Sequence, residues 1–145
     1  MERLIQGIRT FFRPKHQAAH LDKGASGERA AEQLLRRRGL KLLARNFATR
    51  QGEIDLIFRE DTCMVFVEVK TRSDESWSRP AAAVDASKKA RICKTALEYL
   101  RQLHHPECSL RFDIVEVLLD EGSRVREIRH LPDAFSMKEP MRYQR

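Results

Sequence analysis

The 145-residue sequence lacks three features: a disulfide framework, a membrane-length apolar run and a glycine-rich phosphate loop. Its three cysteines, Cys63, Cys93 and Cys108, form no C-x-x-C pair, and their odd number suits a reducing compartment. No apolar run is long enough to span a bilayer, and the first residues carry no signal-peptide hydrophobic region. Without a phosphate loop, use of nucleoside triphosphates is not indicated. We therefore expect a cytoplasmic protein with no membrane partner.

The histidines also lack the spacing of a zinc site. His104 and His105 are adjacent and precede Pro106, which is typical of the end of a helix. His130 lies too far along the chain to complete such a pattern with them. We predict no histidine metal centre.

What the sequence has in excess is positive charge. There are 28 Lys and Arg residues against 21 Asp and Glu residues, a formal net charge of +7. This balance favours an anionic partner, either nucleic acid or a membrane surface, and does not choose between them. An apolar content of 41% over this length fits one domain with a hydrophobic core.

We divide the chain into a basic N-terminal extension over residues 1–22, a domain over residues 23–136 and a polar C-terminal tail over residues 137–145. The apolar residues of the extension fit one face of a short amphipathic helix at a membrane surface. The alternative is a partly ordered tail whose apolar residues dock on the domain. These apolar residues are Leu4, Ile8, Phe11 and Phe12.

Hydrophobic periodicity predicts an α/β domain in the order helix, three strands, helix, two strands. The first helix runs from Gly24 to Arg38, where Gly39 supplies a stop. The segment SDESWSRPAAA, with its Pro80, is expected to be a mobile loop before the second helix. The predicted strands cover residues 40–47, 52–60, 63–72, 110–119 and 125–131, the second helix covers about 85–103, and Phe135 anchors the tail.

The stretch GEIDLIFREDTCMVFVEVKTR, residues 52–72, places charged residues among those of two apolar strands. A tight turn at Asp61 and Thr62 fixes the register of the hairpin. One face is then apolar, and the charges gather on the other face near the strand ends. The apolar face pairs Phe58 with Val65, Leu56 with Val67 and Ile54 with Val69; the other pairs Ile57 with Phe66, Asp55 with Glu68 and Glu53 with Lys70.

Directly opposed carboxylates, with Cβ atoms roughly 4.5–5.5 Å apart, repel one another and weaken a sheet. A divalent cation would compensate, because Mg²⁺ commonly binds one or two carboxylates together with phosphate oxygens. Lys70 lies two residues beyond Glu68 on the same face, where it can meet a phosphate or a water molecule. The alternative is a solvated face with cross-strand salt bridges, including one from Glu53 to Lys70.

Five ordered segments resemble the small bacterial YraN family: GASGERAAEQLL, RNFATRQGEIDLI, FVEVKTR, KKARI and RFDIVEV. That family is similar to archaeal Holliday-junction resolvases and to the PD-(D/E)xK nuclease superfamily. The resemblance covers roughly Gly24 to Phe135 and implies a restriction-endonuclease-like core, order αβββαββ, with a mixed central sheet flanked by helices. Ile54 stands where the superfamily's name has proline.

By this resemblance Asp55 and Glu68 are metal ligands and Lys70 is the catalytic lysine. Glu28 matches a helix-borne glutamate of the resolvase-like branch, and we add the Val69 carbonyl as a further ligand for Mg²⁺ or Mn²⁺. Helical geometry independently places Glu28 at the border of the apolar face. Its alternative role is to complement the helix dipole in the first turn.

The second helix begins with three cations, Lys88, Lys89 and Arg91, which oppose its dipole. A bound phosphate would reverse that penalty, so we nominate them, with Arg72, as contacts to a nucleic-acid backbone. A solvated helix face is the alternative. Trp77 either stacks on an unpaired base or packs on its own domain.

The function expected from these features is a metal-dependent DNA endonuclease that hydrolyses phosphodiester bonds. The resolvase likeness implies branched DNA and a homodimer, because paired cuts in a four-way junction suit a two-fold enzyme. The first alternative is a non-catalytic nucleic-acid-binding protein that retains the nuclease fold. The second is a membrane-surface adaptor that uses the N-terminal extension.

Overall fold

The computed structural model describes residues 18–73 and 84–137, with side chains from Gly24 onward. Trp77, Pro80, most of the N-terminal extension and almost all of the C-terminal tail lie outside these residues. The elements follow the order predicted for the restriction-endonuclease-like core. They are α2 (Ala18–Arg37), β1 (Lys41–Thr49), β2 (Gly52–Glu60), β3 (Cys63–Ser73), α3 (Ala86–Gln102), β4 (Ser109–Leu119) and β5 (Val125–Phe135).

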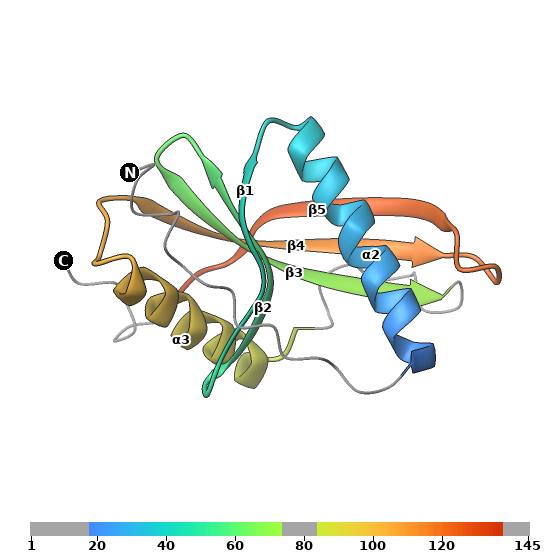
Figure 1. Cartoon of the computed structure of the whole chain (residues 1–145), viewed down its shortest axis with the longest axis horizontal. Helices are drawn as coiled ribbons and strands as arrows, with labels where there is room; N and C mark the ends of the chain where they lie inside the picture. Colours follow the sequence, from blue (N-terminus) through green and yellow to red (C-terminus); the bar gives the residue numbers. More distant parts are fainter. Residues whose placement is uncertain (1–17, 74–83, 138–145) are drawn as a thin grey trace.

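The strands form one mixed sheet in the order β1-β2-β3-β4-β5 (Figure 1). β3 and β4 pair in parallel, and the other neighbours pair antiparallel. A parallel pair needs a crossover connection, which α3 provides. The predicted α/β class and mixed sheet are confirmed.

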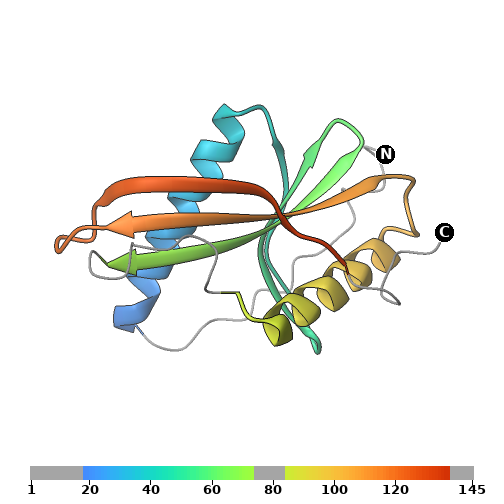
Figure 2. The same ribbon diagram turned by 180° about the vertical axis from the view of Figure 1, so that it is seen from behind.

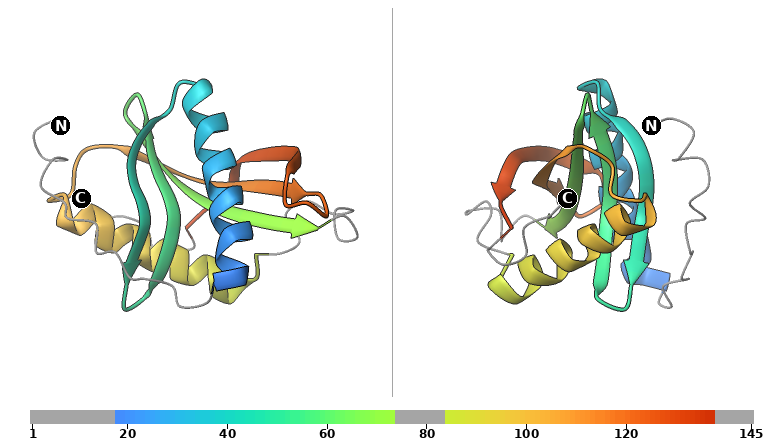
Figure 3. Two further views of the ribbon diagram at one scale, coloured as in Figure 1. Left: turned by 45° about the vertical axis from the view of Figure 1, so that its right-hand side comes forward. Right: turned by 90° about the vertical axis from the view of Figure 1, so that its left-hand side faces the viewer.

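The two helices cover opposite faces of the sheet (Figures 2 and 3). On the α2 face, Ala31 and Leu35 pack with Phe58, Val65 and Val67 of the hairpin. The α3 face has its own core cluster, which includes Ile57, Phe66, Ile92, Ala96, Tyr99, Leu100 and Ile114. Burial from both sides explains why β3 and β4 are nearly continuous apolar runs. In the described part of the chain, neither helix has the length and apolar character needed to cross a membrane.

Helix α2 begins at Ala18, earlier than the predicted Gly24. Alanine is the best helix former, and no proline interrupts the added turn. Gly27 lets this helix approach β3 closely: a Cβ atom there would lie 2.0 Å from Thr71 Oγ1. Glycine thus sets the separation of α2 and β3 one residue before Glu28.

The predicted hairpin register is confirmed from Glu60–Cys63 to Leu56–Val67, around the turn at residues 61–62. The pairs predicted beyond this point, Asp55 with Glu68, Ile54 with Val69 and Glu53 with Lys70, are wrong, because the β2–β3 ladder ends at Leu56 and Val67. Ile54 belongs to the α3 core cluster, whereas Val69 packs against the α2 cluster. β2 keeps its pairing with β1 through Ile54 and Glu53, and the β1–β2 pair curves away from β3 (Figure 1).

Helix α3 and strand β5 lie close to the positions that the sequence predicts. Asp85 caps α3 by accepting a hydrogen bond from the Lys88 backbone N–H, and His104 and His105 follow the helix with positive φ. β5 continues beyond residue 131 to Phe135, whose ring stacks on Phe112 at 5.1 Å between centroids. Pro132 is tolerated there because β5 is an edge strand.

Candidate active site

The site forms where β2 diverges from β3. The ladder between these strands ends at Leu56 and Val67. Beyond it, the Val69 backbone N–H donates a hydrogen bond of 2.8 Å to Asp55 Oδ2, so a carboxylate takes the place of a main-chain carbonyl. The bend of β2 therefore brings the Asp55 side chain to the β3 backbone.

The environment of the Asp55 carboxyl group disfavours its negative charge. Burial raises its pKa well above the usual range, and the Glu68 carboxylate raises it further, against the opposing hydrogen bond from Val69. Glu28 and Glu53 add smaller contributions in the same direction. Four acidic side chains from α2, β2 and β3 are therefore close enough to repel one another.

Glu68 is 6% exposed and faces two lysines through a single oxygen. Lys88 Nζ lies 2.5 Å from Glu68 Oε1, and Lys70 Nζ lies 3.7 Å from the same atom. Burial and the neighbouring Lys88 lower the pKa of Lys70. Although burial acts against it, the contact with Glu68 raises the pKa of Lys88. The structure thus brings Asp55, Glu68 and Lys70 together and adds Lys88.

The predicted salt bridge from Glu53 to Lys70 is wrong, because Lys70 pairs with Glu68 along its own strand. Glu53 instead meets the amide of Asn46. With that amide nitrogen turned toward the carboxylates, it donates to Glu53 Oε1 at 3.2 Å and to Glu28 Oε2 at 3.1 Å. Asn46 therefore joins the α2 glutamate to the β2 glutamate.

Sequence reasoning missed Asn46, although a signal was present. Asparagine is depleted in strands and tolerates the left-handed conformation, so its place inside an apolar strand marks an irregular position. The predicted position of Glu28 toward the sheet is confirmed by its contact with Asn46 and its influence on Asp55.

The donor chemistry of this cluster fits a hard divalent cation. Asp55, Glu68 and Glu28 offer carboxylate oxygens, and the repulsion between Asp55 and Glu68 is what a cation would relieve. Within residues 18–73 and 84–137, however, no three or more His, Cys, Asp or Glu side chains are grouped so as to hold a metal ion. The ammonium group of Lys88 occupies the position beside Glu68.

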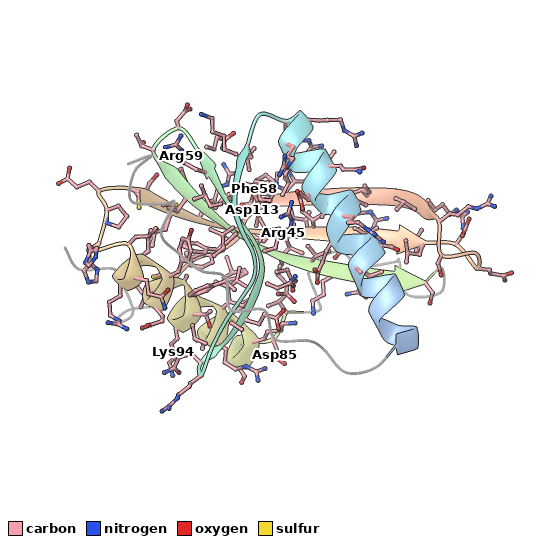
Figure 4. All side chains as sticks on the ribbon, in the orientation of Figure 1. Arg45, Phe58, Arg59, Asp85, Lys94 and Asp113 are labelled. Atoms are coloured by element: carbon pink, nitrogen blue, oxygen red, sulfur yellow. The ribbon has the colours of Figure 1, made fainter. Side chains whose placement is uncertain are left out.

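The other cations nominated for phosphate contact lie on different parts of α3 and β3. Lys89 Nζ lies 5.7 Å from the Phe135 ring centroid, and exposed Arg91 lies beside Gly52 at the β1–β2 turn. Arg72 is partly exposed on β3, two residues beyond Lys70. Asp85 marks the beginning of α3, and Lys94 lies farther along the helix (Figure 4).

A second cluster of charged side chains surrounds Asp113 on β4, which is fully buried (Figure 4). Asp113 accepts hydrogen bonds from Arg111 at 2.9 and 3.0 Å, from the Asp133 backbone N–H at 3.0 Å, and from His130 Nε2 at 2.7 Å. Arg38 lies 2.6 Å from His130 Nδ1 and can only donate, so Nε2 carries the proton that Asp113 accepts. His130 therefore has a structural partner in Asp113.

The sequence matches a family model described as "Uncharacterised protein family UPF0102" over residues 27–117. It is 39% identical over 115 residues to a UPF0102 protein of Trichlorobacter lovleyi, covering 79% of this chain and 90% of that one. It is 41% identical over 118 residues to a UPF0102 protein of Rhodococcus opacus, covering 81% and 99% of the two chains. A UPF0102 protein of Nitrosomonas europaea is 41% identical over 114 residues, with 79% and 93% covered. The chain therefore belongs to the UPF0102 family, the YraN-type group.

Proposed function

We propose that this protein is a metal-dependent endonuclease that hydrolyses phosphodiester bonds in DNA. The observation that carries the proposal is the repulsion between Asp55 and Glu68, two partly or fully buried carboxylates beside Lys70. A fold seldom retains such a pair without a compensating ligand, and strongly perturbed carboxylates cluster at functional sites.

The residues that would hold Mg²⁺ or Mn²⁺ are Asp55, Glu68, Glu28 and the carbonyl of Val69. When bound, the cation would polarise a phosphoryl oxygen and promote ionisation of a water molecule. Asp55 is oriented for this role because its Oδ2 is already held by the Val69 N–H. Asn46 orients Glu28 from the opposite side by sharing its amide with Glu53.

Lys70 would stabilise the negative charge that develops on the phosphate in the transition state. Burial and the nearby Lys88 ammonium group lower the pKa of Lys70. Lys70 and Lys88 place two ammonium groups close together. A phosphate oxygen bound beside them would supply negative charge that offsets their mutual repulsion. Arg72, Lys88, Lys89 and Arg91 are our proposed contacts to the DNA backbone, and the resolvase likeness suggests branched DNA cut by a homodimer.

The direct test is cleavage of four-way-junction and linear DNA in Mg²⁺, Mn²⁺ or EDTA. We expect the wild type to cleave only with metal, and Asp55→Asn, Glu68→Gln and Lys70→Met to lose on the order of 100-fold or more in rate. Glu121→Gln, an exposed carboxylate in the β4–β5 turn, is the matched control and should keep full activity. Cleavage in EDTA, or cleavage that survives all three site substitutions, would contradict the proposal.

The rival function is DNA binding without hydrolysis. One observation favours it: Lys70 and Lys88 already supply positive charge to Glu68. This rival predicts DNA binding that weakens with salt, is indifferent to divalent cations and is not followed by cleavage.

A further inference from the structure

Lys88 is the cation nearest to Glu68 among the described residues. Its Nζ atom lies 2.5 Å from Glu68 Oε1, closer than the 3.7 Å of Lys70. The two lysines come from different elements, Lys70 from β3 and Lys88 from the first turns of α3. Two ammonium groups thus share one carboxylate oxygen, and the neighbouring Asp55 carboxylate attracts both of them.

We propose that Lys88 is a built-in counter-ion, which stands in for a divalent cation beside Glu68 and must swing away when that cation binds. This inference rests on the proposed metal-dependent function and identifies what the metal has to displace. Lys88 thereby sets the affinity of the site for its metal.

The geometry points to Lys88 rather than Lys70 as the group that leaves. Lys70 lies on a strand paired on its β4 side with Glu116, and its side chain is 21% exposed. The Lys88 side chain is 35% exposed, so solvent is directly available to its ammonium group. The Lys88 backbone N–H is held by Asp85 Oδ1 at 2.7 Å, so the motion requires rotation of the side chain alone.

The position of Lys88 in the helix also favours release. A cation in the first turns of a helix is opposed by the helix dipole. No acidic residue lies in the first turn of α3, and Asp85 caps it. Glu68 is therefore the nearest group that holds the ammonium group in place, with a further attraction from Asp55, and a dication on Glu68 would remove the nearest one.

The primary test measures Mn²⁺ affinity by titration calorimetry on the wild type, Lys88→Gln and Lys94→Gln. Lys94 is exposed on the same helix, so its substitution removes an equal charge away from the site. We expect Lys88→Gln to bind Mn²⁺ roughly tenfold more tightly than the wild type, because a competing cation is gone. Lys94→Gln should bind as the wild type does.

The outcomes separate this inference from the proposed function. If the wild type binds Mn²⁺ and Lys88→Gln binds it equally or more weakly, the inference is wrong and the proposed function stands. If neither the wild type nor Lys88→Gln binds Mn²⁺, the metal site itself is wrong and the inference fails with it.

A second measurement uses the unmodified chain and does not depend on the folding of a variant. Lysines are acetylated briefly with and without saturating Mg²⁺, and modification at Lys88 and Lys94 is quantified by mass spectrometry. We expect Mg²⁺ to increase the modification of Lys88 several-fold relative to Lys94, because the ion pair with Glu68 no longer protects it. An unchanged ratio between the two lysines would overturn the inference.

Discussion

Two aspartates in this protein, Asp113 fully buried and Asp55 partly buried, have opposite electrostatic surroundings. Asp113 is the more deeply buried, and burial alone would raise its pKa, yet hydrogen bonds from His130, Arg111 and Asp133 hold that pKa below its usual value. Among the described residues, Asp55 accepts one hydrogen bond, from the Val69 N–H, and its pKa is raised by burial and by Glu68.

The difference shows that burial by itself does not explain the state of Asp55. The same sheet supplies Asp113 with a bidentate arginine, a histidine and a backbone donor. Around Asp55 the sheet places Glu53 and Glu68 instead, and α2 adds Glu28. Asp113 is a structural carboxylate whose charge is balanced by its hydrogen-bond donors, whereas Asp55 lies beside carboxylates that raise its pKa.

The largest expected effect comes from breaking the satisfied cluster. Asp113→Asn leaves Arg111 without its buried carboxylate, and we expect a loss of about 3 kcal/mol in the free energy of unfolding. Urea denaturation measures this loss, with Glu121→Gln as an exposed control of equal charge change. A loss no larger than that of the control would show that Asp113 is not structurally important.

The matched substitution at Asp55 should change the free energy of unfolding in the opposite direction. Asp55→Asn removes a carboxylate that is repelled by Glu68 while keeping its shape. We expect the metal-free protein at pH 7 to become more stable, by up to about 1 kcal/mol, because the substitution removes repulsion between like charges on neighbouring strands. Destabilisation comparable with that of Asp113→Asn, again measured in urea, would remove the contrast between the two clusters.

The pH dependence of stability sharpens the same contrast. The pKa of Asp55 is raised on folding, so the folded state binds its proton more tightly and stability falls as pH rises above about 4 toward the raised value. The pKa of Asp113 is lowered, so its contribution is present above about pH 4 and is lost as pH falls through the lowered value. We expect the difference between wild type and each Asn variant to change with pH in opposite directions. Parallel profiles in thermal unfolding from pH 3 to 7 would be inconsistent with this assignment.

A smaller effect on stability is expected from a substitution in α2, the helix that carries Glu28 close to Asp55. Gly27→Ala would place a Cβ atom 2.0 Å from Thr71 Oγ1, next to Glu28. Alanine normally stabilises a helix relative to glycine, but here we expect a loss of about 1 kcal/mol from overpacking. Gly24→Ala, which meets nothing within 4 Å, is the control and should be neutral or stabilising. Thr71→Ala should rescue the variant; failure to do so would refute the packing explanation.

The parts of the site set by local pattern were predictable from the sequence. Alternation around the turn at residues 61–62 gave the correct register for four apolar positions, Leu56, Phe58, Val65 and Val67. The divergence of β2 from β3 was not predictable, because a side chain, Asp55, takes the place of a ladder bond to the Val69 N–H. Strand alternation carries no information about such a replacement.

Contacts between distant segments could not be predicted from the sequence either. The cluster around Asp113 forms at an irregularity of the β4–β5 pairing, where Asp133 has a positive φ. The approach of Lys88 to Glu68 depends on where the crossover helix begins relative to β3. Helical periodicity predicted that α3 exists and which face is buried, but it does not fix the position of that helix along the sheet.

The parallel pairing of β3 with β4 has a consequence for the order of folding. Asp55 and Val69 are 14 residues apart within one hairpin, so their contact closes a short loop. Lys88 reaches Glu68 only after the chain has passed beyond the hairpin and begun the crossover. Because shorter loops close at lower entropic cost, we expect the contact between Asp55 and Val69 to form before the contact between Lys88 and Glu68. In the hairpin alone, Glu68 is paired with Lys70 and not yet with Lys88.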